Sequence, residues 1–251
     1  MKSFAKQALC YVFAVFFVLL AWELSALALN TPAFPTPQET IPVFCSFAPA
    51  MVPDFLISFH RVGFSLVVGT LLGLPLGLFL GRCPRVDALF APVLYILYPL
   101  PKIVILPILL VLLGLGGTPK IALITLTVFF QVVMVMRDSA RGIPEPLVAS
   151  VRSLGGSRWD VWRHVVIPST LPELFTTLRV SVAIAIAVLF FSESIAGSTG
   201  LGYFIMNSWA MVNYPRMFAG IIALALLGVA IYLFFDVCER RLTRWRHAGR
   251  N

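Results

Sequence analysis

The chain has 251 residues, of which 59% are hydrophobic and only 12% are charged, and its formal net charge is +8 at pH 7. Soluble globular domains contain about 45–50% apolar and about 25% charged residues. The composition therefore excludes an ordinary soluble domain and indicates a protein that crosses a membrane several times. In such proteins basic residues beside the spans set the orientation, so the positive charge alone does not point to nucleic acid.

Six stretches have the roughly 20 apolar residues that a membrane-spanning helix requires. We therefore predict an all-α, polytopic membrane protein with six transmembrane helices. The expected spans are residues 8–29, 61–81, 88–113, 118–136, 172–195 and 217–235. They divide the chain into residues 1–57 (the first span and a proline-rich outer loop), residues 58–240 (the other five spans) and a basic tail, 241–251.

The first span and its flanks leave two interpretations open. Two N-terminal lysines, an apolar run and then Ala26-Leu27-Ala28 are also typical of a cleaved signal peptide. Five further spans favour a retained helix. Most Lys and Arg residues fall on the side of the N-terminus, whereas Arg61, Lys120 and Arg216 fall on the other side. The positive-inside rule then predicts that both termini are cytoplasmic, and Lys120 is expected to snorkel from the end of its span.

The segment between the first two spans, residues 30–58, contains the sequence NTPAFPTPQETIP. Proline has no backbone N–H and disfavours a helix interior. We therefore expect this outer segment to be extended or turning.

The second span carries a glycine at every fourth position. This spacing places the glycines on one face of the helix, where a second helix can approach closely. Static packing is the favoured interpretation, and a moving helix contact is the alternative. The glycines are Gly69, Gly73, Gly77 and Gly81.

The third span is interrupted by Pro99, Pro101, Lys102 and Pro107. Prolines kink helices, and the carbonyls that they free persist in a membrane only beside protein or a watery cavity. A lysine in lipid costs about 2.5–3.5 kcal/mol on insertion scales. We therefore expect a broken helix beside a pathway, with Lys102 either contacting an anionic solute or snorkelling.

The fifth span ends with Glu193 and then the sequence GSTGLG, which includes Gly200 and Gly202. Ionisable residues within a span are functional candidates. Glu193 lies near the outer end of its span, where water or a polar neighbour would also satisfy it. We favour a role for these three residues in an outer gate or its architecture.

Residues 145–167 separate the fourth and fifth spans. Leu147, Val151 and Leu154 have the spacing of one apolar helix face, and Gly155 is a typical helix terminator. This pattern predicts a short amphipathic helix that ends at a glycine corner.

A second short helix is expected after that corner. Ser157 can cap its N-terminus, with Asp160 three residues later, and Pro168 and Pro172 are expected to stop it. Trp159 lies on its apolar face. An isolated pair of such helices is most often a membrane-surface anchor.

The order of residues in LVASVRSLGGSRWDVWRHVVIPSTLPELFTTLR resembles the cytoplasmic loop of binding-protein-dependent ABC importer permeases. Gly155 takes the glycine position of the family pattern and Pro168 takes its proline position. Ala149 stands where the family has a glutamate, so the ion pair of that glutamate is not expected here. The stretches PAFPTP, RVGFSLVVGTLLGLPLGLFLG, YPLPKIVILPILLVLLGLG and SESIAGSTGLGYFI are similar to the nitrate/sulfonate/taurine branch of this family.

The resemblance implies a type I permease that works as a dimer in the bacterial inner membrane. A homodimer is favoured over a heterodimer. The loop between spans four and five would couple it to a cytosolic ATPase that binds ATP and Mg²⁺, and a periplasmic or lipid-anchored protein would deliver the solute. Nitrate, an alkanesulfonate, taurine, bicarbonate or a vitamin precursor would suit the branch. The residues expected to contact the ATPase are Leu147, Val151, Arg152, Ser153, Leu154, Gly155, Arg158, Trp159, Arg163 and Pro168.

The sequence contains no G-x-x-x-x-G-K-[ST] phosphate loop and no metal-ligand spacing of Cys and His. ATP hydrolysis and a cofactor are therefore not expected in this chain. An ion-gradient-driven transporter or a channel is the main alternative, and it predicts ionisable residues near the bilayer midplane. A membrane-embedded enzyme would need a catalytic constellation, which the scattered acids and three histidines do not supply.

Overall fold

The structure is a computed structural model that describes residues 2–243, and this part of the chain is helical with no strand. The all-α prediction is confirmed. Residues 244–251 of the expected basic tail lie outside the described residues. The elements are α1 (Lys2–Leu29), α2 (Pro37–Arg82), α3 (Pro84–Leu97), the 3₁₀-helix η1 (Lys102–Ile105), α4 (Leu106–Leu113), α5 (Thr118–Arg141), α6 (Glu145–Ser153), α7 (Arg158–Val161), the π-helix η2 (Trp162–Val166), α8 (Ile167–Ala196), α9 (Leu201–Ala210) and α10 (Tyr214–Leu242).

Within residues 2–243, five helices are long and apolar enough to cross a membrane, and a sixth span results if α3 and the η1–α4 segment are counted together. These two segments are bent by 82° relative to each other. The expected break in the third span is therefore present. The bounds of that span, however, were wrong, because α3 already begins at Pro84 and ends at Leu97.

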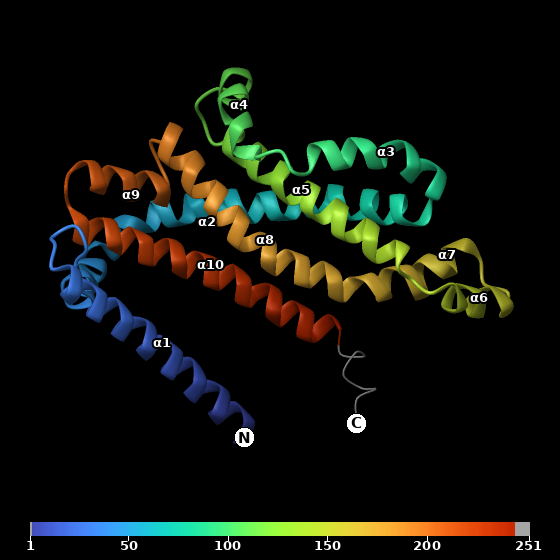
Figure 1. Cartoon of the computed structure of the whole chain (residues 1–251), viewed down its shortest axis with the longest axis horizontal. Coiled ribbons are helices and arrows are strands. Elements are labelled where there is room, and N and C mark those ends of the chain that lie inside the picture. The colour runs from blue at the N-terminus through green and yellow to red at the C-terminus, as the bar shows by residue number, and fades with distance from the viewer. Residues whose placement is uncertain (1, 244–251) are drawn as a thin grey trace.

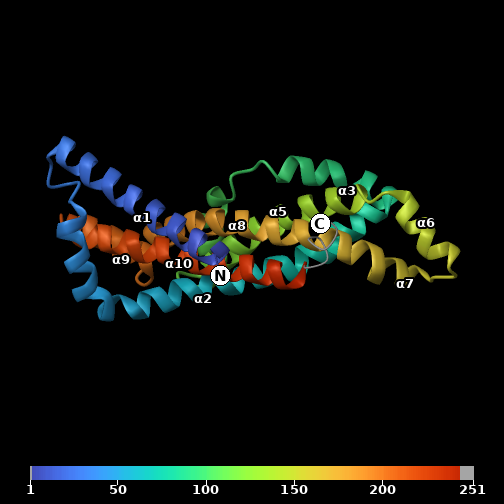
Figure 2. The ribbon, with the colours of Figure 1, turned by 90° about the horizontal axis from the view of Figure 1, so that it is seen from below.

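The long helices α2, α5, α8 and α10 run along the length of the molecule and pack against one another (Figure 1). Helices α6 and α7 form one tip of this bundle, while α9 and residues 30–36 lie at the opposite tip (Figure 2). Helix α1 leaves the bundle at an angle. It contacts the rest through Trp22, whose indole Nε1 donates to the carbonyl of Pro35 at 3.0 Å and whose ring stacks on Phe218.

The glycine stripe of α2 lies directly against α5. A Cβ atom added to Gly69 would be 2.9 Å from side-chain atoms of Val128, and one added to Gly77 would be 2.7 Å from the carbonyl oxygen of Val133. Real Cβ atoms do not come this close to other atoms, so only glycine permits this helix separation. The stripe thus brings two backbones together along the centre of the bundle.

The expected extended or turning outer segment is present at residues 30–36. For residues 37–58 the expectation was wrong, because α2 begins at Pro37 and continues through Pro42, Pro49 and Pro53. Thr36 caps the helix in a capping box with Glu39, and Pro37 occupies the first turn, where its missing N–H costs nothing. Interior prolines are tolerated in membrane helices because neighbouring groups and local adjustments satisfy the freed carbonyls. Proline content therefore gave a misleading boundary here.

The bundle has a large apolar core, with a second, smaller cluster around Leu80, Leu94, Phe130 and Val133, but also a large apolar surface. Val62, Ile124 and Leu189 are fully buried, whereas Val111 and Leu112 of α4 are 85% and 72% exposed. Such exposure is expected of helices surrounded by lipid or by another membrane subunit.

Candidate functional site

The tip formed by α6 and α7, which we call the two-helix loop (residues 145–166), has a sharply defined corner. The backbone N–H of Gly155 donates to the carbonyl of Arg152, and that of Gly156 donates to Val151, both at 3.0 Å. These two bonds make a Schellman motif, and Gly155 adopts the left-handed φ of +81° that the motif requires. The corner is thus fixed by the backbone itself.

The second helix of the loop begins as expected. The hydroxyl of Ser157 accepts the N–H of Asp160 at 3.2 Å, and the carboxylate of Asp160 accepts the N–H of Ser157 at 2.8 Å. This reciprocal pair is a capping box. The loop therefore has a rigid start to α7 only two residues after the glycine corner.

Pro168 and Pro172 do not stop this helix, contrary to expectation. Residues 158–196 form one continuous helical stretch, in which η2 is a π-helical turn and α8 follows it at Ile167. Pro168 lies in the first turn of α8, where proline is tolerated. Pro168 has no N–H to donate to a carbonyl of the preceding turn. That turn is the wider π-helical η2, where the N–H of Ile167 donates to the carbonyl of Trp162, and the helix continues through it. The two-helix loop is consequently joined to α8 without a flexible linker.

One side of the two-helix loop is anchored and the other is exposed. Val148 is fully buried and Val161 is 6% exposed, whereas Leu154 is 89%, Trp159 66% and Leu147 48% exposed. Val148 and Val161 therefore join the core of the bundle, whereas Leu147 and Leu154 of the expected apolar face remain exposed. Val151 is half-buried at the edge of this contact.

The polar residues of the loop are exposed as well. Glu145 lies 3.8 Å from Arg152 and 3.9 Å from Arg82 at the end of α2. Arg158 and Arg163 make no ion pair within the described part of the chain, and Ser153 is exposed. Together with the exposed leucines, this surface can accept both apolar and acidic groups of a partner.

The opposite tip contains a buried cluster around Glu193, which is 0% exposed. Its carboxylate accepts bonds from Arg61 Nη1 at 2.6 Å, from the hydroxyl of Ser58 at 2.9 and 3.0 Å, and from the N–H of Gly202 at 2.9 Å. Arg61 also donates to the carbonyl and the hydroxyl of Thr199. We call Ser58, Arg61, Glu193 and Gly202 the Glu193 cluster.

The Glu193 cluster fixes the connection between α8 and α9. Gly200 has φ +105°, and its N–H donates to Asp54 Oδ1 at 2.7 Å, while the N–H of Leu201 donates to Ser58 Oγ at 2.9 Å. Free N–H groups at the start of a helix need such partners. The side chains of α2 thereby hold the first turn of α9 in place.

The sequence showed Glu193 but not its partners. Arg61 was expected near the outer surface and is 6% exposed, and Lys120, expected to snorkel, is 1% exposed. A lone arginine and a lone glutamate at the ends of two different apolar runs were the available signal. Recognising their pairing required the arrangement of the helices in space.

A second ion pair that the sequence did not indicate lies toward the two-helix loop. Arg137 of α5 donates to Asp87 of α3 with two nitrogen atoms, one bond being 2.8 Å long from Nη2, and donates to the hydroxyl of Tyr95 at 3.1 Å. Arg137 is 2% exposed. Such a bidentate pair fixes orientation as well as distance, so α3 is fastened to α5.

The break in the third span places Lys102 beside a hollow of about 480 Å³ between η1, α5 and α8. The ammonium group of Lys102 donates to the carbonyls of Leu97, at 3.0 Å, and Tyr98. Pro101 is exposed at the break and Pro107 lies in the first turn of α4. Pro99 belongs to the turn after α3. The prolines thus shape the break, and Lys102 alone among these four residues lines the hollow.

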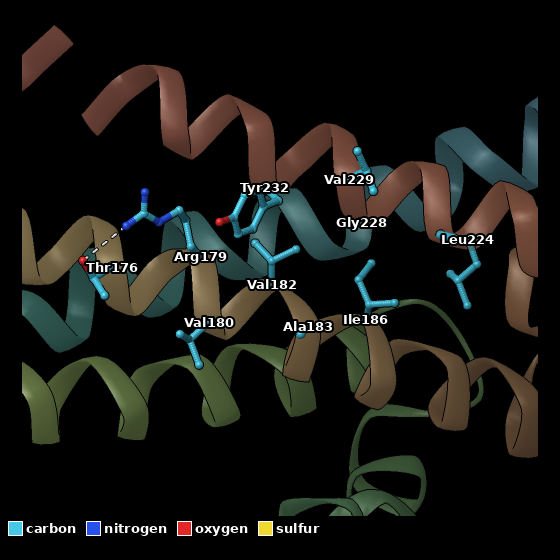
Figure 3. Close-up of a pocket in the computed structure, with 11 residues that line it drawn as sticks. Thr176, Arg179, Val180, Val182, Ala183, Ile186, Leu224, Gly228, Val229 and Tyr232 are labelled. Carbon is cyan, nitrogen blue, oxygen red and sulfur yellow. Dashed lines mark hydrogen bonds between the residues drawn. The ribbon is translucent and has the colours of Figure 1, made fainter. Parts of the chain in front are cut away.

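A larger hollow of about 780 Å³ lies between α8 and α10 (Figure 3). Arg179 and Tyr232 lie toward one end of it, and aliphatic residues such as Ile186 and Leu224, together with Ala183 and Gly228, line the remainder (Figure 3). Arg179 is 3.1 Å from Asp236 and 2.6 Å from Glu239. Its charge is therefore balanced by carboxylates of α10, and the hollow is mainly apolar.

The sequence matches the profile of one protein family over residues 69–244, and that family is described as "Binding-protein-dependent transport system inner membrane component". The chain is 29% identical over 232 residues to the taurine transport system permease protein TauC of Escherichia coli (strain K12), which covers 89% of this chain and 84% of that protein. It is 30% identical over 192 residues to the aliphatic sulfonates transport permease protein SsuC of Bacillus subtilis (strain 168), with 76% and 70% covered.

The fold is also similar to a solved one. A chain of the MetNI methionine ABC transporter in an inward facing conformation superposes with a TM-score of 0.66 and 20% identity, covering 77% of this chain and 96% of that chain. At this identity the likeness concerns the fold alone.

Proposed function

The chain belongs to the family of binding-protein-dependent transport system inner membrane components, and on that premise we propose that it carries a small taurine- or sulfonate-like solute by alternating access, driven by ATP that a separate subunit hydrolyses. It is the permease component of an ABC importer and not itself an enzyme. The relatives that transport taurine and aliphatic sulfonates support the choice of solute.

The observation that carries the coupling role is the exposure of the two-helix loop. Leu154 is 89% exposed although a Schellman corner and a capping box hold it in a fixed position. An exposed leucine does not add to the stability of the isolated chain, whereas a groove on a partner would bury its side chain. We assign this groove to a cytosolic ATPase that binds ATP and Mg²⁺.

The rigid connection to α8 gives the loop a way to transmit movement. Because residues 158–196 are one continuous helical stretch, a displacement of Trp159 moves the helix that borders both hollows. Closure of the ATPase would thus shift α8 and alternate the side on which the pathway opens, a change between two packed states.

The remaining partners follow from the same premise. The family name implies a solute-binding protein at the outer face, and a second copy of this chain would complete a central pathway. Arg152, Arg158 and Arg163 are exposed on the two-helix loop, and by the positive-inside rule this supports a cytoplasmic position for this tip and both chain termini. The protein then lies in the inner membrane with the Glu193 cluster at its outer side.

The test is purification of the tagged chain from its host in mild detergent, followed by measurement of bound ATPase activity. We expect a stoichiometric ATPase with the unaltered chain and with Leu115→Asp, whose residue is 76% exposed at a distance from the loop. Leu154→Asp should lower the bound ATPase at least tenfold. A chain that retains no ATPase and moves solute into liposomes without ATP would instead be a gradient-driven transporter.

A second substitution separates binding from coupling. Gly155→Val places a β-branched residue at φ +81°, which such residues strongly disfavour, while no atom lies within 4 Å of the added Cβ. The corner must therefore change its backbone conformation rather than relieve a clash. We expect ATP hydrolysis to continue while uptake per ATP falls, and undiminished uptake would contradict the coupling role.

A further inference from the structure

Lys102 lies half-buried at a break in the bundle. The hollow beside it is lined by Thr127 of α5 and by Ala183, Ala187 and Phe191 of α8. Thr127 is nine residues from the start of α5, which is about 14 Å along a helix that is about 36 Å long. The ammonium group is therefore placed well inside the apolar length of the helices. Ionisable groups at such depth are candidates for a solute pathway.

The hydrogen bonds of Lys102 are explained by the break but do not use all of its capacity. In a continuous helix the N–H of residue 101 would bond to the carbonyl of Leu97, and Pro101 has no N–H. Lys102 donates to this freed carbonyl and to that of Tyr98. An ammonium group has three donors, so one remains available beside the hollow.

The charge of Lys102 is not balanced by a carboxylate. Arg61, Arg137 and Arg179 each pair with an acidic side chain. The residues that line the Lys102 hollow include no acid, and in the described part of the chain Lys102 forms no ion pair. Besides the two carbonyls, the rings of Tyr98 and Phe130 lie 5.3 and 5.0 Å from the ammonium group. The hollow thus carries a positive charge without a counter-charge beside a mainly apolar lining, and such a charge attracts an anion.

We propose that Lys102 and this hollow form the contact for the acidic group, a sulfonate or similar oxyanion, of the solute on its way through the membrane. The inference rests on the proposed transport function and names the residue that would select the charge of the solute. The hollow of about 480 Å³ is large enough for a small organic anion. Ala183 and Ala187 leave this space open because their side chains are short.

The experiment measures charge selection directly in the assembled complex. In a background without the four native cysteines, Ala187→Cys is modified with the anionic 2-sulfonatoethyl methanethiosulfonate and with its cationic trimethylammonioethyl analogue. The ratio of the two rates should favour the anion, and Lys102→Met should lower this ratio about tenfold, because one unit charge several ångströms away is removed. Lys102→Arg should keep most of the preference.

A matched control is Leu115→Cys, which is exposed outside the hollow. Its rate ratio should not change with Lys102→Met. An Ala187→Cys variant that reacts with neither reagent, or whose rate ratio is the same with and without Lys102, would overturn the proposal. So would a loss of preference in Lys102→Arg equal to that in Lys102→Met, because Lys102 would then act through its shape as a helix cap.

The two proposals fail in different ways. If the chain captures its ATPase but the rate ratio does not respond to Lys102, the anion contact is wrong and the transport function stands. If no ATPase is captured, the coupling role fails whatever the ratio. Uptake of ethanesulfonate by the reconstituted importer gives an independent measure, and Lys102→Met should raise KM at least tenfold.

Discussion

The Glu193 cluster and the two-helix loop lie at opposite tips of the bundle. The side chains of the first are paired within this chain, whereas those of the second are largely exposed. Glu193 is 0% exposed and receives bonds from Arg61, Ser58 and Gly202, all within this chain. Leu154 is 89% exposed although the Schellman bonds of the adjacent glycine corner fix its backbone. A tip that is closed by its own buried bonds needs no partner to be stable, whereas the loop tip has fixed geometry with unused contact surface. The contrast indicates which tip receives an external force.

The largest loss of stability is expected when the buried ion pair between Arg61 and Glu193 is broken. Glu193→Ala leaves Arg61 buried without its carboxylate, which costs about 3–5 kcal/mol when one partner of a buried pair is removed. Glu173→Ala on the exposed face of α8 should change stability by no more than about 0.5 kcal/mol. Denaturant titration in mild detergent measures both. Equal stability of the two variants would mean that the Glu193 cluster does not hold its tip together.

Two glycines with positive φ permit a closer comparison. At Gly200, with φ +105° and ψ 165°, a Cβ would meet the carboxylate of Glu193, whereas nothing lies within 4 Å of a Cβ at Gly155. Gly200→Ala should therefore cost the backbone strain of about 1–3 kcal/mol and also displace Glu193 from its bonds. Gly155→Ala should cost only about 1–2 kcal/mol for the left-handed conformation. The same titration separates them, and a greater loss at Gly155 would reverse the comparison.

The smallest effects concern the two capping boxes, one near each tip. Thr36 caps α2 through Glu39 and Ser157 caps α7 through Asp160. Replacing such a cap by alanine costs about 0.5–2 kcal/mol. In Thr36→Ala the loss should reach the global stability, because α2 is central to the bundle. In Ser157→Ala it should stay local and appear as faster hydrogen exchange of residues 158–162. We therefore expect Ser157→Ala to unfold globally more slowly than Thr36→Ala. Faster global unfolding of Ser157→Ala would contradict the prediction.

Much of the fold could be predicted from the sequence, because the apolar runs are long and the caps and glycine spacings involve residues that are close together in the chain. The apolar runs identified the spans, the glycine spacing on α2 indicated a close helix approach, and Ser157 with Asp160 predicted the cap that is present. Failures came where a local rule competed with the surroundings. Pro42, Pro49 and Pro53 did not prevent α2 from forming, and Pro168 did not end a helix that could widen into a π-turn.

By itself, the sequence determined that this is a helical membrane protein, which stretches cross the membrane and where its family's loop pattern falls, because hydropathy, caps and glycine corners act over a few residues. Only the tertiary structure decided which charges are buried together, since Arg61 and Glu193 are 132 residues apart along the chain. It likewise decided that Val148 rather than Leu154 faces the bundle and that Lys102 borders a hollow without a carboxylate. Pairing and exposure depend on how helices are rotated against one another, and no single segment contains that information.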